Sequence, residues 1–306
     1  MKAILFLAFA AAVAGESLTL TPQSPWKTSS GAYSIEYDGS TYANIGATLP
    51  VEPESHYIVR WMMKSSVREM KPVFQASVDV GDFGNALRGF VVGDSWNEYA
   101  FCFFSGGVSS VPFKIYCNPS PAKTIEVKDV TIVKISAEQF FKNLMPDGNF
   151  MAAKDIPVLW RPSYGIPELP ATIVPVSDFL AGEQCMQLKS ANPEKGASIE
   201  SIHIPMLPGK SFKLSFWAKC TADTVLAGGV NGWSMYKHTG GHWYKQESFK
   251  VTTSWNEFTL QFDIPADFAA NPDLRSQMLL INFGQKKNDG AVYISGIKFR
   301  QIDKSK

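Results

Sequence analysis

The segment Gly228–Lys245, GGVNGWSMYKHTGGHWYK, gathers side chains that could bind a ligand. It holds two Trp, two Tyr and two His between glycines, with neither the alternation of a strand nor the apolar stripe of a helix. Large rigid rings on such a bending, polar segment can stack on the apolar face of a sugar ring, while nearby amides bind its hydroxyl groups. The candidate ligand-binding residues are therefore Asn231, Trp233, Tyr236, His238, His242, Trp243 and Tyr244.

Two other patterns could do chemistry, and both favour a simpler interpretation. His238 and His242 have a spacing that would suit zinc on a helix, but two glycines lie between them and no HExxH glutamate is present. Asp79, Asp82 and Asp94 could supply the two carboxylates of a glycoside hydrolase, yet Asp, Gly and Asn clusters are typical of hairpin turns. We find no nucleophile elbow, phosphate loop or dinucleotide fingerprint in context, so we expect no catalytic residue, no metal and no enzyme.

The first residues are typical of an export signal. Lys2 precedes an apolar run, Ala3–Ala11, and Ala12-Val13-Ala14 matches a small-residue cleavage site. We expect residues 1–14 to be a signal peptide and the mature protein to be secreted or periplasmic. No later segment is apolar enough to span a bilayer, so we expect no membrane insertion.

Composition narrows the class of partner. The 306 residues carry a formal net charge of +1, which gives no basic field for nucleic acid. Export permits disulfides. Pairing within domains would join Cys102 to Cys117 and Cys185 to Cys220, whereas four buried thiols in strands are an equal alternative.

Short alternating runs between turn residues predict an all-β protein, with helical pattern only near Ala137–Leu144 and Pro265–Ala270. The two halves of the chain also match in the same order, which indicates a duplicated domain. We expect one module at residues 16–136 and a second at residues 143–303, each a β-sandwich. The matches are Leu49–Ser65 with Ile204–Cys220, Gly93–Phe103 with Thr252–Phe262, and Lys123–Ile135 with Gly290–Ile302.

The duplication divides the eight tryptophans into those that pair between the two copies and those that do not. Six form pairs between the copies, and we expect these rings to fill a shared core. Trp233 and Trp243 have no counterpart in the first copy, which leaves ligand contact, covering of the core, or docking against the first module as their roles. The expected pairs are Trp61 with Trp217, Trp96 with Trp255, and Trp26 with Trp160.

The second half resembles the carbohydrate-binding modules of families 4, 9, 16 and 22, which are jelly rolls of the galactose-binding-like superfamily. The resemblance rests on NLMPDGNF (Asn143–Phe150), LPGKSFKLSFWAK, TTSWNEFTLQF and AVYISGIKF, in that order. It implies a structural calcium, but Met151 and the pair Ser295-Gly296 stand where acidic ligands are expected, so we expect none.

These observations predict an exported, non-catalytic protein of two tandem jelly-roll β-sandwich domains that binds a polysaccharide or glycan through loop aromatics of the second domain. The alternative is a structural or protein-interaction component of an exported assembly, with the same aromatics at a protein interface. The fold alone does not decide between them.

Overall fold

The computed structural model describes residues 16–22, 26–29, 31–37, 43–81, 85–117, 123–152, 154–179, 184–189, 196–234, 242–285 and 290–303. The expected signal peptide lies outside these residues. No helix in the described ranges has the length and apolar character needed to cross a membrane.

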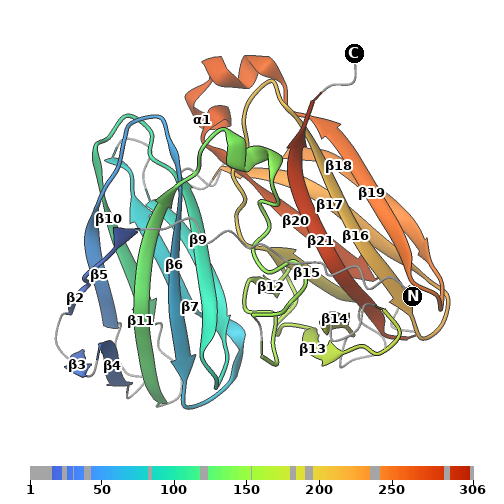
Figure 1. Cartoon of the computed structure of the whole chain (residues 1–306), viewed down its shortest axis with the longest axis horizontal. Helices are drawn as coiled ribbons and strands as arrows, with labels where there is room; N and C mark the ends of the chain where they lie inside the picture. The colour runs from blue at the N-terminus through green and yellow to red at the C-terminus, as the bar shows by residue number, and fades with distance from the viewer. Residues whose placement is uncertain are drawn as a thin grey trace, which may run out of the picture.

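The first half of the chain forms two antiparallel sheets packed face to face (Figure 1). One sheet has the order β3-β4-β11-β6-β9, with β1 added beside β11, and the other has the order β2-β5-β10-β7-β8. The strands are β1 (Glu16–Ser17), β2 (Thr21–Pro22), β3 (Lys27–Ser29), β4 (Ala32–Tyr37), β5 (Ala43–Pro50), β6 (His56–Ser65), β7 (Glu69–Asp79), β8 (Asn85–Val92), β9 (Asn97–Phe104), β10 (Ser110–Cys117) and β11 (Lys123–Lys134).

The second half repeats this arrangement. Its sheets have the orders β13-β14-β21-β16-β19 and β12-β15-β20-β17-β18. The strands are β12 (Trp160–Pro162), β13 (Ala171–Pro175), β14 (Gln184–Leu188), β15 (Ala197–Ser201), β16 (Ser211–Cys220), β17 (Thr224–Ser234), β18 (His242–Val251), β19 (Asn256–Asp263), β20 (Gln277–Gln285) and β21 (Val292–Ile302). Helical structure in the described ranges is short: the 3₁₀ helices η2 (Glu138–Phe141) and η3 (Ala266–Ala270), and α1 (Pro272–Arg275).

The strand order establishes the duplication independently of the sequence matches. Each strand from β2 to β11 has a partner ten places later that holds the same position in its sheet. Even a local irregularity recurs: the ladders β11–β6 and β21–β16 are both interrupted by a bulge. Asp129 and Gly296, at matching places in these bulges, both have a positive φ, of 52° and 60°. The expected all-β fold of two tandem β-sandwiches is confirmed.

The opening motif NLMPDGNF has a structural role. Asn143 Nδ2 donates to the carbonyl of Ile297 at 3.1 Å, and its Oδ1 accepts from the backbone N–H of Phe299 at 2.9 Å. Gly148 leaves room for the same strand, because a Cβ there would lie 2.0 Å from the carbonyl of Ile297. The motif therefore ties the start of the second sandwich to its closing strand β21.

The expected pairing of Trp61 with Trp217 is wrong by one residue. Trp61 faces Tyr99 across the β6–β9 ladder, and the equivalent position of the β16–β19 ladder is Phe216, which faces Phe258. Trp61 and Phe216 are both buried in their cores. Trp217, the next residue, points to the other side of its sheet and is only half-buried, because successive side chains of a strand alternate in direction.

The other pairs divide in the same way. Trp26 and Trp160 are both buried, but their predicted pairing is wrong: Trp160 begins β12, whose equivalent is β2, whereas Trp26 comes after β2. Trp96 and Trp255 occupy equivalent positions but are half-buried on outer faces, so they do not fill a core. Each lies under a matching lysine: Lys64 Nζ is 5.0 Å from the Trp96 ring and Lys219 Nζ is 5.3 Å from the Trp255 ring.

The four cysteines are buried thiols, so the alternative to the two disulfides holds. Cys102 lies in β9 and Cys117 in β10, which belong to opposite sheets of the first sandwich. Cys185 in β14 and Cys220 in β16 are separated by β21, a distance of about 9.5 Å at the usual strand spacing. A disulfide bridges Cα atoms only about 4.4–6.8 Å apart.

Thiol titration checks this arrangement. We expect four thiols to react with Ellman's reagent after denaturation and none rapidly in the native protein, because burial raises the pKa values of Cys102 and Cys185 to about 12. Reductant should leave the melting temperature unchanged. Recovery of only two thiols, or none, after denaturation without reductant would contradict the structure.

Candidate ligand-binding cleft

A cleft of about 720 Å³ lies on the outer face of the sheet β12-β15-β20-β17-β18. Strand alternation produces its floor. Ile199, Val230 and Ile281 point into the core, and the intervening residues of β15, β17 and β20 point outward. Those outward residues include Ser198, Glu200, Ala227, Asn231, Trp233, Asn282 and Gly284. This volume lies within the range that is typical of small-molecule binding sites.

Small residues in the floor make the cleft hollow. Ala227, Gly229 and Gly284 stand where larger outward side chains would fill it. At Gly229 a Cβ would lie 3.0 Å from Cζ3 of Trp243 and 2.9 Å from the carbonyl of Lys245. The glycine thus allows the Trp243 ring to lie close against β17.

Three of the predicted binding residues line this cleft: Asn231 and Trp233 from β17, and Trp243 from the neighbouring strand β18. Trp243 is paired with Asn231 across the two strands, and its side chain is 50% exposed. Trp233 and Trp243 therefore share one concave surface.

Tyr244 lies outside the cleft, which removes it from the candidate site. Its hydroxyl donates to Oε1 of the buried Gln277 at 3.0 Å, and its ring stacks on Phe262 at 5.7 Å. A bulge explains this direction: Val230 pairs with Lys245 and Asn231 with Trp243, so Tyr244 is the extra residue between them. Tyr236 and His238 lie outside the described residues, and of His242 only the backbone, paired with Gly232, is described.

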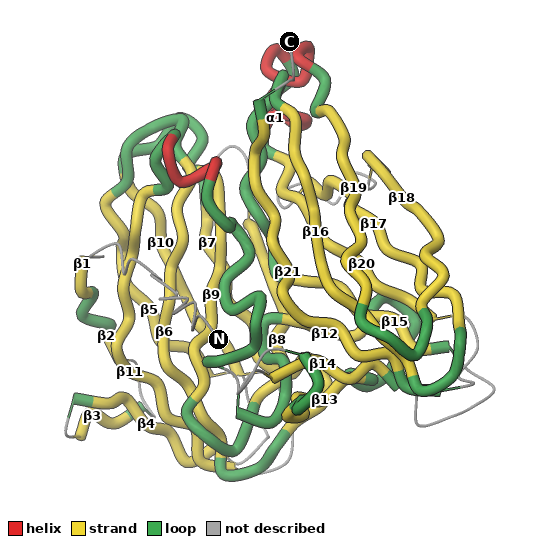
Figure 2. Tube along the Cα trace, turned by 45° about the vertical axis from the view of Figure 1, so that its right-hand side comes forward, coloured by secondary structure: helices red, strands yellow, loops and turns green. Residues whose placement is uncertain are grey.

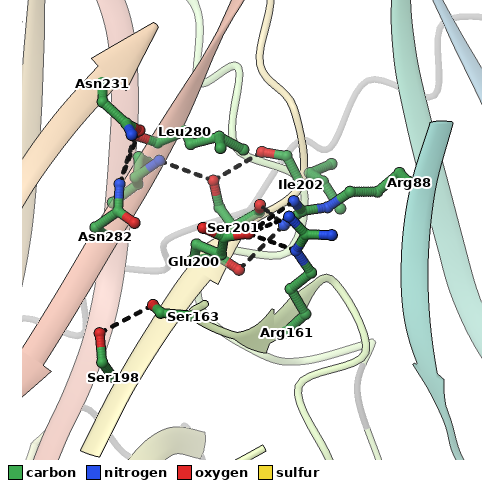
Figure 3. A network of polar contacts seen from close by, with 11 residues as sticks. Arg88, Arg161, Ser163, Ser198, Glu200, Ser201, Ile202, Asn231, Leu280 and Asn282 are labelled. Atoms are coloured by element: carbon green, nitrogen blue, oxygen red, sulfur yellow. Dashed lines mark hydrogen bonds and ion pairs between the residues drawn. The ribbon is translucent and has the colours of Figure 1, made fainter. Parts of the chain in front are cut away.

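Polar side chains on the floor are held in place by hydrogen bonds to each other (Figure 3). Asn282 Nδ2 donates to Asn231 Oδ1 at 2.9 Å, and Ser198 Oγ donates to Ser163 Oγ at 2.9 Å. Each amide keeps further donor or acceptor groups beyond this bond. Such fixed groups can select the orientation of a hydroxylated ligand.

An ion-pair network borders the same floor (Figure 3). Glu200 Oε1 accepts hydrogen bonds from Arg161 of β12 and, at 3.0 Å, from Arg88 Nη1 of the first sandwich. Burial raises the pKa of the Glu200 carboxyl, but the charges of Arg88 and Arg161 outweigh it, so this pKa lies below its usual value. Glu200 is therefore ionised at neutral pH.

Sequence reasoning missed Arg161, Glu200, Asn282 and the loop around Tyr164, whose side chain is fully exposed at the rim. Alternation within each strand places Ser198 and Glu200 on one face of β15, and Leu280 and Asn282 on one face of β20. The pairing of β15 with β20 is what brings these four side chains to the same side of one sheet, and no local sequence pattern contains that pairing.

A second aromatic group lies on the other sheet of the second sandwich, but its rings cover each other. Phe179 packs 4.6 Å from Trp255 and 5.5 Å from Trp217. Lys219 lies over Trp255, and Asp178 accepts hydrogen bonds from both Lys219 and Trp255 Nε1. Because these rings cover each other, this group is a less suitable stacking surface than the cleft.

Trp243 is not buried by docking against the first sandwich. Pro72 of β7 is the one residue of the first sandwich among the described residues that line the cleft. Trp243 remains half-exposed beside it. The first sandwich borders the cleft without covering its rings. Within the described ranges, no group of three His, Cys, Asp or Glu side chains converges in a way that could hold a metal ion.

No model of a protein family and no curated protein matches the sequence. The solved structures similar to this chain include a tandem CBM22-1–CBM22-2 pair from Xyn10C of Paenibacillus barcinonensis, at 13% identity over 96% of this chain and 100% of that one, with a TM-score of 0.36. A family 16 carbohydrate-binding module matches at 18% identity over 51% of this chain and 99% of that one, with a TM-score of 0.37. TmCBM61 in complex with β-1,4-galactotriose matches at 14% identity over 53% and 99%, with a TM-score of 0.37.

Each of these matched structures consists of carbohydrate-binding modules, the class that the sequence resembles, and one of them is a tandem pair. What each matched protein binds is a property of that protein.

Proposed function

We propose that this protein is a non-catalytic carbohydrate-binding protein that holds a polysaccharide or glycan in the cleft of its second sandwich. The observation that carries the proposal is the convergence of Trp233 and Trp243 with the hydrogen-bonded pair Asn231–Asn282 on one hollow face. Rings supply stacking area and the amides supply directional contacts to hydroxyl groups. The signal peptide expected at residues 1–14 would direct this binding to the cell exterior or periplasm.

The charges in the cleft suit binding better than hydrolysis. Glycoside hydrolysis ordinarily uses two carboxyl groups on either side of the scissile bond, one of them protonated at the working pH. Glu200 is the one carboxylate among the described residues that line the cleft, and it is held ionised by two arginines. It has neither the partner nor the raised pKa that a general acid needs.

A protein interface remains the competing use of the same rings. A flat aromatic patch would suit a protein partner, whereas this surface is concave and its polar groups are already oriented. A partner recovered reproducibly at stoichiometric amounts, together with no binding to any glycan, would favour the protein-interaction alternative.

Filling the cleft tests the proposal directly. The mature chain would be titrated against soluble xylan, β-1,4-galactan, galactomannan, mixed-linkage β-glucan and polygalacturonate by affinity electrophoresis and calorimetry. Ala227→Phe places a ring on the floor of the cleft and should weaken binding to the recognised polysaccharide at least tenfold, a loss of about 1.4 kcal/mol. The fold should be kept, because Ala227 is outward-facing and only half-buried.

Val225→Phe is the matched control. Val225 lies on the same strand, two residues before Ala227, is 50% exposed and does not line the cleft. Binding should be unaffected by it. Equal affinity of the Ala227→Phe variant and the parent protein would show that a bound glycan lies elsewhere, and no binding of the parent to any glycan would reject the proposed function.

A further inference from the structure

Arg88 of the first sandwich is buried against the second one. It projects from β8, and its side chain is only 2% exposed. Among the described residues it is the only Arg, Lys, Asp or Glu that is buried as a whole residue. Its guanidinium group donates to Glu200 Oε1 at 3.0 Å and to the backbone carbonyl of Ser201, both in β15 (Figure 3).

A buried arginine is costly, and this one is not the only contact between the described residues of the two sandwiches. Burying a charge requires several compensating contacts, and an apolar residue of similar size often stabilises a protein equally well. Other contacts join the units: Leu169 N–H donates to the carbonyl of Met70 at 2.9 Å, and Arg275 forms an ion pair with Glu54 at 3.1 Å. The segment between β11 and β12 lies between the two sheet pairs (Figure 2).

The contacts of Arg88 lead instead to the cleft. Glu200 shares one oxygen, Oε1, between Arg88 and Arg161. Arg161 lines the cleft with a side chain that is 33% exposed. It uses Nε and Nη2 toward Glu200, which leaves part of its five-donor edge for a ligand. Arg88 therefore fixes the carboxylate on which the orientation of Arg161 depends.

We propose that Arg88 is a positioning residue of the cleft, through which the first sandwich orders the Glu200–Arg161 pair that a bound glycan contacts. This inference rests on the proposed function. The first sandwich then contributes to the binding site of the second sandwich in two ways: Pro72 lines the cleft, and Arg88 orients the residues that contact the ligand. Without Arg88, Glu200 keeps only Arg161, and that pair can adopt other arrangements that no longer present the guanidinium to the ligand.

The test uses the full mature chain and the same five polysaccharides. Arg88→Met should weaken binding to the recognised polysaccharide about tenfold. Arg88→Lys should recover part of the loss, since an ammonium group keeps the charge but cannot contact Glu200 and the Ser201 carbonyl with the same fork. Glu200→Gln completes a double-mutant cycle with each Arg88 variant. The fold-loss of affinity in the double variant should be clearly smaller than the product of the fold-losses in the two single variants, because both side chains act through one network.

Two controls separate positioning from stability. Lys64→Met removes an ion pair with Glu126 in the same sandwich and should leave binding unchanged. Ile35→Ala creates a cavity in the first core and should lower the melting temperature while leaving affinity unchanged below it. If Arg88→Met does not fold, the affinities of Arg88→Lys, Glu200→Gln and their double variant test the same inference.

Each outcome decides the inference. Parent-like affinity of the Arg88 variants, or independent losses in the cycle, would overturn it while leaving glycan binding established. Absence of binding by the parent protein would overturn the proposed function and this inference together.

Discussion

Replacing Trp233 and Trp243 together by alanine should lower the affinity for the recognised glycan at least a hundredfold. Tryptophans at the centre of a binding surface commonly contribute about 2 kcal/mol or more each, and about 2.7 kcal/mol in total already gives a hundredfold change. The two rings come from adjacent strands and line the same hollow. Each single variant should lose part of the affinity, with Trp243, half-exposed at the surface, the more easily tolerated change for folding.

Calorimetric titration of the single and double variants measures the effect. Trp255→Ala is the matched control, since it removes a half-buried tryptophan that comes directly before β19 of the other sheet of the same sandwich. Its affinity should equal that of the parent. If the Trp255 variant lost binding and the double variant kept it, the ligand surface would be the Phe179–Trp217–Trp255 group and not the cleft.

The fold could be predicted because its evidence is local and repeated. The alternation of apolar and polar residues predicted the strands. Three matches in the same order in both halves of the chain predicted the duplication, so the prediction did not depend on any single motif. The strand orders then agree position by position. The identities of Asn231, Trp233 and Trp243 as cleft residues were predictable for a different reason: aromatic and amide side chains gathered on a segment broken by glycines are typical of a binding surface.

The rest of the cleft depends on long-range pairing that no local pattern contains. Arg88 and Glu200 are 112 residues apart in the chain, and Arg161 reaches Glu200 from another strand. The misplacement of Tyr244 has a different cause. Composition grouped it with Trp243, but a bulge opposite Val230 and Asn231 turns Tyr244 away and lets Trp243 and Gln246 face the same side.

The pairing of Trp61 with Trp217 failed by a single residue, and a strand converts such an error into the opposite face of a sheet. This correction has a large expected effect on stability. Trp61→Ala and Phe216→Ala should each lower the free energy of unfolding of their sandwich by about 3–5 kcal/mol, because each leaves a large cavity in a closed core. Trp217→Ala should cost only about 1 kcal/mol, since its ring lies on the outer face against Phe179.

Guanidinium unfolding of the three variants, followed by fluorescence and circular dichroism, would measure these differences. A separate transition is fitted for each sandwich where the probes do not coincide. Phe216→Ala and Trp217→Ala form the sharper comparison, because they alter neighbouring residues of one strand and remove aromatic rings from opposite sides of it. A cost at Trp217 equal to that at Phe216 would contradict the register of β16 on β19. A small cost at Phe216 would contradict its equivalence with Trp61.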